Sequence, residues 1–183
     1  MRTRLAATVA MGMVLGAAAI GLGSGVARGP DDKEAVVKAL DSLHELASKA
    51  DEAKYFALFA PDGVFLGTDA TERWTVDEFR AYAHPHFSQG HGCTYVARPG
   101  KRHVTVKGDA AWFDEVVDNE KYGECRGTGV LARIDGAWKI EQYNLTVPVP
   151  NDLMLKVVEM IKTQGPAPAD GKKSGGGGGE GKK

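Results

Sequence analysis

Four polar side chains on neighbouring predicted strands have the types and spacing to handle a proton and a substrate oxygen. His103 lies in a predicted strand over 102–106, and Asp114 lies in the next one, 110–119. A two-residue turn at Gly108–Asp109 pairs His103 with Asp114, whereas a turn shifted by one residue pairs Lys101 with Asp114 and keeps His103 inside. An Asp beside a His fixes the imidazole tautomer and tunes its pKa. These two residues are therefore the predicted catalytic pair.

The amides Gln142 and Asn144 are expected to share that face. Asp135–Gly136 is a strong signal for a two-residue hairpin turn. Counting from it, Gly129 faces Gln142 and Gly127 faces Asn144. Because the two glycines have no side chains, they leave space beside the two amide groups. Such a space with polar groups around it suits a small-molecule site. Amide groups there can hold a substrate oxygen.

The position of Asp114 depends on the turn before the next strand. If Glu120–Lys121 is a two-residue turn, Gly127 faces Asp114 and Gly129 faces Trp112, so Trp112 also lines the site. If a turn has an odd number of residues, the faces swap, because side chains alternate along a strand. Phe113, Glu115 and Val117 would then point inward, and Asp114 would be a surface charge.

Histidine and cysteine are dense in one stretch, but their spacing matches no metal site. His84, His86, His91 and Cys93 are potential ligands for zinc or copper. Pro85 and the neighbouring glycines leave their geometry open, and a polar loop is the preferred interpretation, so no metal is predicted. The two cysteines of the chain, Cys93 and Cys125, are candidates for one disulfide, the alternative being two free thiols.

The elements that position these residues follow from hydrophobic periodicity. Helical stripes predict helices over 31–49, 51–60 and 152–162. Thr75 and Glu78 form a capping box, so a further helix begins at Val76, and Pro85 should kink it or end it early. Short strands are expected over 62–67 and near 94–97, where Pro99–Gly100 interrupts the chain before 102. Helices gathered on one face of an antiparallel meander indicate an α+β domain.

Several segments resemble the SnoaL-like families of the nuclear transport factor 2-like superfamily. They are Phe59–Phe65, Thr71–Trp74, Gly108–Trp112 and Gly136–Ile140. The resemblance covers roughly residues 32–151. It implies a cone in which a curved antiparallel sheet wraps round about three helices, with a pocket at the wide end, here followed by a C-terminal helix. Tyr55 and Trp74 are added to the expected pocket lining. The superfamily includes isomerases, dehydratases, cyclases, epoxide hydrolases and proteins that only bind, so no catalytic residue is transferred.

The two ends of the chain differ from the middle. Residues 5–23 carry no charge and follow Arg2 and Arg4, and small residues lead to Ala27. This pattern predicts a signal peptide over 1–27 and export, periplasmic or extracellular, with a retained membrane anchor over 5–23 as the alternative. The domain is expected over 30–163, and the Gly- and Lys-rich residues 164–183 should form a disordered tail.

Charge limits the partners that the domain can have. The chain has 23 basic and 24 acidic residues; without the predicted signal and the tail, 17 basic and 22 acidic residues remain. An acidic domain without a basic cluster is a poor nucleic-acid binder. We therefore expect an exported domain that binds a small organic molecule, with no cofactor predicted. The alternatives are a cofactor-independent lyase, isomerase or hydrolase using Asp114 and His103, and a homodimeric assembly module without ligand.

Overall fold

The computed structural model describes residues 30–164. The predicted signal peptide, the anchor at 5–23 and nearly all of the predicted tail lie outside these residues. The helices are α1 (Pro30–Ser48), α2 (Glu52–Phe56), α3 (Val76–Phe87) and α4 (Met154–Gln164). The strands are β1 (Phe59–Leu66), β2 (Arg73–Thr75), β3 (Val96–Lys107), β4 (Ala110–Asn119), β5 (Gly123–Ile134) and β6 (Ala137–Thr146). No helix within 30–164 is long and apolar enough to cross a bilayer.

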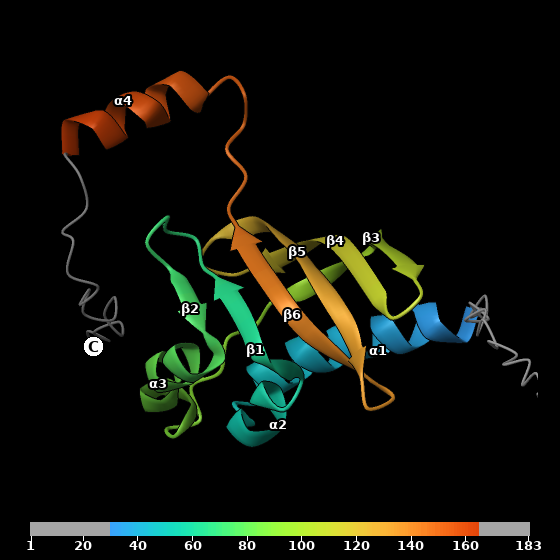
Figure 1. Cartoon of the computed structure of the whole chain (residues 1–183). Helices are drawn as coiled ribbons and strands as arrows, with labels where there is room; N and C mark the ends of the chain where they lie inside the picture. Colours follow the sequence, from blue (N-terminus) through green and yellow to red (C-terminus); the bar gives the residue numbers. More distant parts are fainter. Residues whose placement is uncertain (1–29, 165–183) are drawn as a thin grey trace, which may run out of the picture.

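The six strands form one curved sheet in the order β2-β1-β6-β5-β4-β3, and α1, α2 and α3 lie on its concave side (Figure 1). Every neighbouring pair is antiparallel except β1 with β6, which is parallel. This architecture confirms the α+β cone with a C-terminal helix.

The first helix is held by the apolar stripe that the sequence predicts. Val36, Leu40, Leu43 and Ala47 are all buried against the sheet. Asp31 and Asp32 lie in the first turn, where the helix dipole favours acids. Because α1 packs along β3 and β6, its inner side chains reach the middle of the cone.

The third helix begins with the predicted capping box. The Thr75 hydroxyl accepts a hydrogen bond from the Glu78 backbone N–H at 3.3 Å, and the Glu78 carboxylate accepts one from the Thr75 backbone N–H at 2.9 Å. Pro85 lies in the last turn, and the helix ends at Phe87. This fixed start orients Phe79, Ala83 and Phe87 toward the core.

Two local predictions near Pro61 were wrong. The second helix ends at Phe56, and β1 already begins at Phe59, so Pro61 lies in a strand. The pairing of β1 with β6 shifts between Phe59 and Val64, and this irregularity accommodates a residue that has no N–H to donate. The short strand β2 was not predicted, because three residues carry too little pattern.

The turn that anchors the meander is confirmed. Ile134 pairs with Ala137, and Asp135 and Gly136 have positive φ angles of 49° and 81°, as a type I′ turn requires. The irregularity predicted at Pro99–Gly100 is also present, between Ala97 and Arg102 of β3. The first of the two alternatives for the next turn is the right one, since Lys107 pairs with Ala110 and His103 with Asp114.

Two shifts of one residue reverse the predicted inner face. Asn119 pairs with Gly123, so the loop between β4 and β5 has three residues rather than two. The Asn119 side chain accepts hydrogen bonds from the backbone N–H groups of Lys121 and Tyr122, both at 3.0 Å, and Gly123 adopts a positive φ of 70°. In β6, Ile140 pairs with Leu131 but Gln142 pairs with Val130, so Glu141 is the extra residue of a bulge.

Candidate functional site

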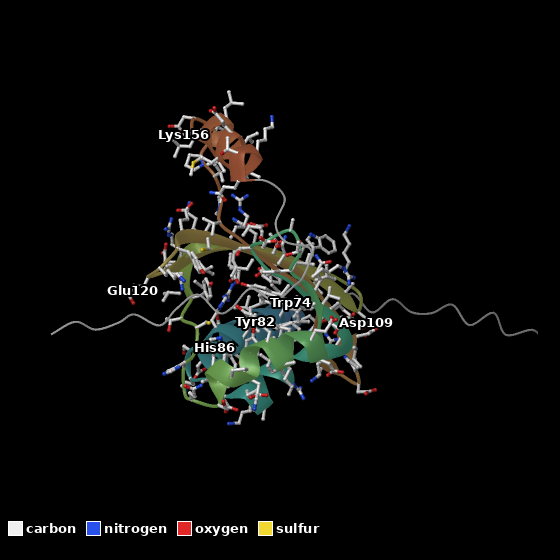
Figure 2. All side chains as sticks on the ribbon, turned by 90° about the vertical axis from the view of Figure 1, so that its left-hand side faces the viewer. Trp74, Tyr82, His86, Asp109, Glu120 and Lys156 are labelled. Carbon is white, nitrogen blue, oxygen red and sulfur yellow. The ribbon has the colours of Figure 1, made fainter. Side chains whose placement is uncertain are left out.

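A cavity of about 380 Å³ opens between the concave face of the sheet, α1 and α3. It is in the size range of small-molecule sites. Trp74 of β2 and Tyr82 and His86 of α3 belong to its lining and lie close together (Figure 2). The lining also includes His44 from α1 and Leu145 from β6.

Aromatic rings form one wall of the cavity. Tyr82 stacks on Trp74 with ring centres 4.6 Å apart, and Phe65 stacks on Phe79 at 3.9 Å. Trp74 and Phe79 are themselves nearly parallel, with ring planes 10° apart. All five tyrosines of the chain line this cavity: Tyr55, Tyr82, Tyr95, Tyr122 and Tyr143. The wall is therefore flat and largely aromatic.

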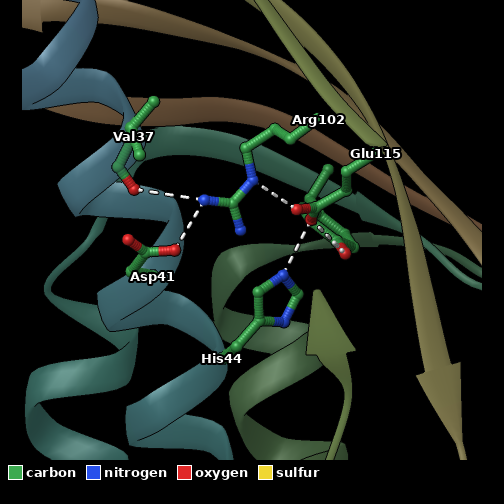
Figure 3. A network of polar contacts seen from close by, with 6 residues as sticks. Val37, Asp41, His44, Arg102 and Glu115 are labelled. Carbon is green, nitrogen blue, oxygen red and sulfur yellow. Dashed lines mark hydrogen bonds and ion pairs between the residues drawn. The ribbon is translucent and has the colours of Figure 1, made fainter. Parts of the chain in front are cut away.

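A buried carboxylate, Glu115, is held by His44 of α1 and Arg102 of β3 (Figure 3). Glu115 of β4 is only 1% exposed. Its Oε1 lies 2.7 Å from Nε2 of His44, and its Oε2 accepts a hydrogen bond from Nε of Arg102 at 2.7 Å. The Tyr143 hydroxyl donates to Oε1 at 3.5 Å. Arg102 also reaches α1, where it pairs with Asp41 at 2.6 Å.

This network keeps Glu115 ionised. Burial raises the pKa of the Glu115 carboxyl, but the hydrogen bonds from His44 and Arg102, together with the Arg102 charge, outweigh burial and hold that pKa below its ordinary value. Burial, together with the nearby Glu115 charge, raises the pKa of Tyr143 well above its ordinary value, so the phenol stays protonated. Glu115 is thus a charged hydrogen-bond acceptor, and Tyr143 is a neutral donor.

His44 and Tyr143 are the members of the network that line the cavity. With Nε2 beside Glu115, the tautomer that donates from Nε2 leaves Nδ1 as an acceptor. Among residues 30–164, Nδ1 has no hydrogen-bond partner. The arrangement can therefore accept a proton or a hydrogen bond from a molecule in the cavity.

The two predicted strand glycines do face inward, but the space beside them is filled. A Cβ on Gly127 would lie 2.6 Å from the Tyr143 hydroxyl and 3.0 Å from Glu115 Oε1. A Cβ on Gly129 would lie 2.8 Å from a ring carbon of Phe113. These glycines let large side chains approach the sheet, and the cavity lies further toward α1 and α3.

The prediction that Asp114 and His103 face the pocket was wrong. They are paired neighbours, as expected, but both are exposed on the outer face of the sheet. The three-residue loop after Asn119 shifts the pairing of β4 with β5 by one residue, so Glu115 rather than Asp114 faces Gly127. The alternative with swapped faces is the one the structure adopts.

The same reversal moves three other predicted lining residues. Gln142 and Asn144 lie on the outer face, because the bulge at Glu141 turns Tyr143 and Leu145 inward. Trp112 is 43% exposed on that face, where the Lys107 ammonium lies 5.5 Å from its ring centre. Tyr55 and Trp74, in contrast, line the cavity as predicted.

The residues that the sequence reasoning missed carried partial signals. His44 lies one residue after Leu43 in the predicted helical stripe, at its cavity-facing edge. Asn119 followed at four residues by Gly123 is the pattern of a three-residue hairpin loop ending in a positive-φ glycine. No comparable signal marks the bulge at Glu141.

The cysteines and the histidine-rich stretch do not form the sites considered for them. Cys93 and Cys125 are free thiols in the structure, one exposed and one buried, which is the second of the two alternatives that the sequence left open. Within residues 30–164, no group of three or more His, Cys, Asp and Glu side chains is arranged to hold a metal ion. His86, His91 and Cys93 instead belong to the cavity lining.

Solved structures with this fold are numerous, and three of them, all distant in sequence, illustrate the likeness. A domain of unknown function with a cystatin-like fold from Nostoc punctiforme is 13% identical, with a TM-score of 0.59 over 72% of this chain and 86% of that one. A candidate dehydratase of the NTF2-like family from Streptomyces avermitilis is 15% identical, with a TM-score of 0.56 over 67% and 100%. A candidate scytalone dehydratase from Novosphingobium aromaticivorans is 14% identical, with a TM-score of 0.54 over 65% and 85%.

These likenesses show the fold alone. A comparison with curated proteins found no match. The model of the SnoaL-like domain, however, matches residues 36–150, which include every strand of the sheet and the cavity lining. The chain therefore belongs to the SnoaL-like domain family of NTF2-like proteins.

Proposed function

We propose that this domain binds a small, flat and largely apolar organic molecule in its cavity. The observation that carries the proposal is the aromatic wall, in which Trp74 lies between Tyr82 and Phe79 with ring planes 27° and 10° from its own. Offset stacking of a ligand ring against such a wall contributes about 0.5–1.5 kcal/mol beyond the area that is buried. A polar group on the ligand would meet Nδ1 of His44.

The test is a binding titration with a matched pair of tryptophan variants. Anilinonaphthalene sulfonate serves as a flat aromatic probe, and its fluorescence reports binding. Trp74→Leu should weaken binding at least about tenfold, because it removes about 1.4 kcal/mol or more of stacking and apolar contact. Trp112→Leu, on the outer face, should leave binding unchanged. Equal effects of the two variants would contradict the proposal.

A second candidate function is supported by the 2.7 Å contact between His44 and Glu115 at the cavity wall. A histidine held by a buried carboxylate can act as a general base. In an elimination, Nδ1 would take a proton from a carbon beside a carbonyl, and a carbon–carbon double bond would form as the hydroxyl group departs. That proton would then pass to the departing hydroxyl group, which leaves as water. In an isomerisation, the proton would return to another carbon. Two similar structures are described as candidate dehydratases.

Proton exchange tests this second function without knowledge of the product. Tetralone, a flat cyclic ketone, is incubated with the protein in heavy water, and loss of its α-proton signal is followed by nuclear magnetic resonance. His44→Gln should reduce the protein-dependent exchange rate by about 10²-fold or more. His84→Gln, on an exposed histidine that pairs with Glu52, is the matched control. If tetralone binds without accelerated exchange in the unaltered protein, the catalytic candidate is wrong and the binding proposal stands.

Export is proposed on the N-terminal sequence pattern alone. Cleavage after Ala27 would leave Arg28 as the first residue, whereas a retained anchor would keep the chain in the membrane fraction. Intact-mass measurement of the protein recovered from the extracytoplasmic fraction distinguishes the two, and recovery of the full-length chain from the cytoplasm would contradict both.

A further inference from the structure

The helix α4 has an apolar stripe that is largely open to solvent, with Val157 and Val158 half-buried and the other stripe residues exposed. Met154, Val157, Val158 and Ile161 recur at helical spacing, and none of the residues of α4 is buried. Ile161 is 62% exposed. The helix stands off from the sheet on the linker that follows β6 (Figure 1). Exposed apolar surface of this kind marks a site that packs against another surface.

The linker to α4 begins at the cavity. Leu145, the penultimate residue of β6, belongs to the cavity lining, and Thr146 is the last residue of the strand. The linker over 147–153 can span up to about 23–25 Å when extended. The helix itself is about 16 Å long, because each of its residues rises 1.5 Å. The segment is therefore long enough to turn back and lie across the cavity opening.

The cavity opening presents an apolar surface that fits this helix. Tyr82 and Tyr122 line the cavity and are nevertheless 48% and 46% exposed, so they lie where it opens. The outer face of the sheet is a poorer partner, even though Trp112 and Val130 are exposed there. Asp114, Thr128 and Gln142 surround that pair, and an apolar stripe would bury these polar groups without hydrogen bonds.

We propose that α4 is a lid that closes over the cavity, with its stripe of Met154, Val157, Val158 and Ile161 packed on Tyr82 and Tyr122. The structure shows the open form. Closure buries apolar side chains of the opening and of the helix together and excludes water from a bound molecule. The lid concerns access to the cavity, so its occurrence does not require the proposed ligand class to be right.

Disulfide trapping with the native Cys93 tests closure directly. Cys93 is an exposed free thiol in the cavity lining, and Cys125 is buried. Ile161→Cys places a thiol on the apolar stripe, whereas Thr163→Cys, two residues later, places one on the opposite side of the helix. Both full-length variants are oxidised under mild conditions and mapped by peptide mass spectrometry. The expected result is an intramolecular disulfide with Cys93 that forms at least about tenfold faster in Ile161→Cys.

Three outcomes would overturn the lid. They are equal rates for the two variants, a disulfide that links two chains, and no disulfide with Cys93 while the thiol introduced by Ile161→Cys reacts readily with a small reagent. A linked pair of chains would instead place α4 on a second copy. Adding Cys93→Ser to Ile161→Cys should abolish the product and serves as the control for attack on Cys125.

Release kinetics give a second readout. A chain that ends at Asn151 keeps the residues matched by the family model but lacks α4. Anilinonaphthalene sulfonate should dissociate from it at least about fivefold faster than from the full chain. Equal rates would overturn the lid, whereas failure of both chains to bind the probe would count against the ligand proposal and leave the disulfide result to decide on the lid.

Discussion

Glu115 is the buried charge on which the inner face of the sheet depends most. Replacing it by Gln leaves Arg102 and His44 without their anion, and breaking a buried ion pair at one partner costs about 3–5 kcal/mol. Because Gln keeps the shape and one acceptor, we expect about 3 kcal/mol of lost unfolding free energy at pH 7, measured by urea denaturation. The matched control is Asp118→Asn, an exposed carboxylate paired with Arg98, which should cost at most about 1 kcal/mol.

The stabilisation by Glu115 should depend on pH with a definite sign. The pKa of this carboxyl is lower in the folded chain than its unfolded value of about 4.3, so the unfolded state binds more protons in acid. The contribution is complete above about pH 5 and is lost as the pH falls through the folded-state pKa. The difference in unfolding free energy between the unaltered protein and Glu115→Gln should therefore shrink below about pH 4. A difference that is the same at about pH 7 and about pH 3 would show that the carboxylate charge is not what stabilises the fold.

Gly127 should be intolerant of even a methyl group. The Cβ of Gly127→Ala would crowd the Tyr143 hydroxyl and Glu115, and overpacking of this kind costs about 1–3 kcal/mol. Tyr143→Phe removes the crowded hydroxyl, so the double variant should be more stable than the sum of the two single effects predicts, by about 1 kcal/mol. Thermal or urea unfolding of the four proteins measures this coupling. Strict additivity would mean that the two residues do not share this space.

At the scale of single residues, the sequence predicted chemistry better than position. Tyr55 and Trp74 line the cavity as expected, because large aromatic side chains on the inner side of a cone either pack in the core or line the cavity. Asp114 and Glu115 are adjacent carboxylates. Which of them is buried depends only on whether the loop between β4 and β5 has an even or an odd number of residues. The local sequence does not fix how many residues the loop between β4 and β5 contains. It therefore leaves open which of the two carboxylates is buried.

Among the elements, α3 depends on a cap that can be removed alone. Thr75→Ala deletes the hydroxyl that accepts from Glu78 and should cost about 1 kcal/mol of unfolding free energy. Thr75→Ser keeps the acceptor and should cost less than half as much. Both are measured by urea denaturation. If Thr75→Ser is as damaging as Thr75→Ala, the contribution comes from the pairing of Thr75 with Val64 in the sheet instead of the cap.

The elements that were predicted well have strong local signals. The capping box at Thr75, the Asp135–Gly136 turn and the stripe of α1 each fix a backbone geometry within a few residues. The bulge at Glu141 has no such signal, because it is determined by the pairing of β6 with its neighbouring strands and not by the residues around Glu141. It lies in β6 between Ile140, which pairs with Leu131, and Tyr143, whose side chain points inward, and so it decides which side chains reach the cavity.

For the whole molecule, α4 should add nothing to the stability of the empty domain. No residue of α4 is buried in the open form, so a chain ending at Asn151 should have the same unfolding free energy as one ending at Gln164, within about 0.5 kcal/mol. Leu145→Ala, six residues upstream of that end, removes a buried side chain and should cost about 2–4 kcal/mol. Urea denaturation of the three proteins without added ligand makes the comparison. A loss of more than about 1 kcal/mol on removing α4 would mean that the helix is already packed on the domain when the cavity is empty. The open arrangement would then be the minor form in solution, and the lid would govern entry of a ligand as much as its release.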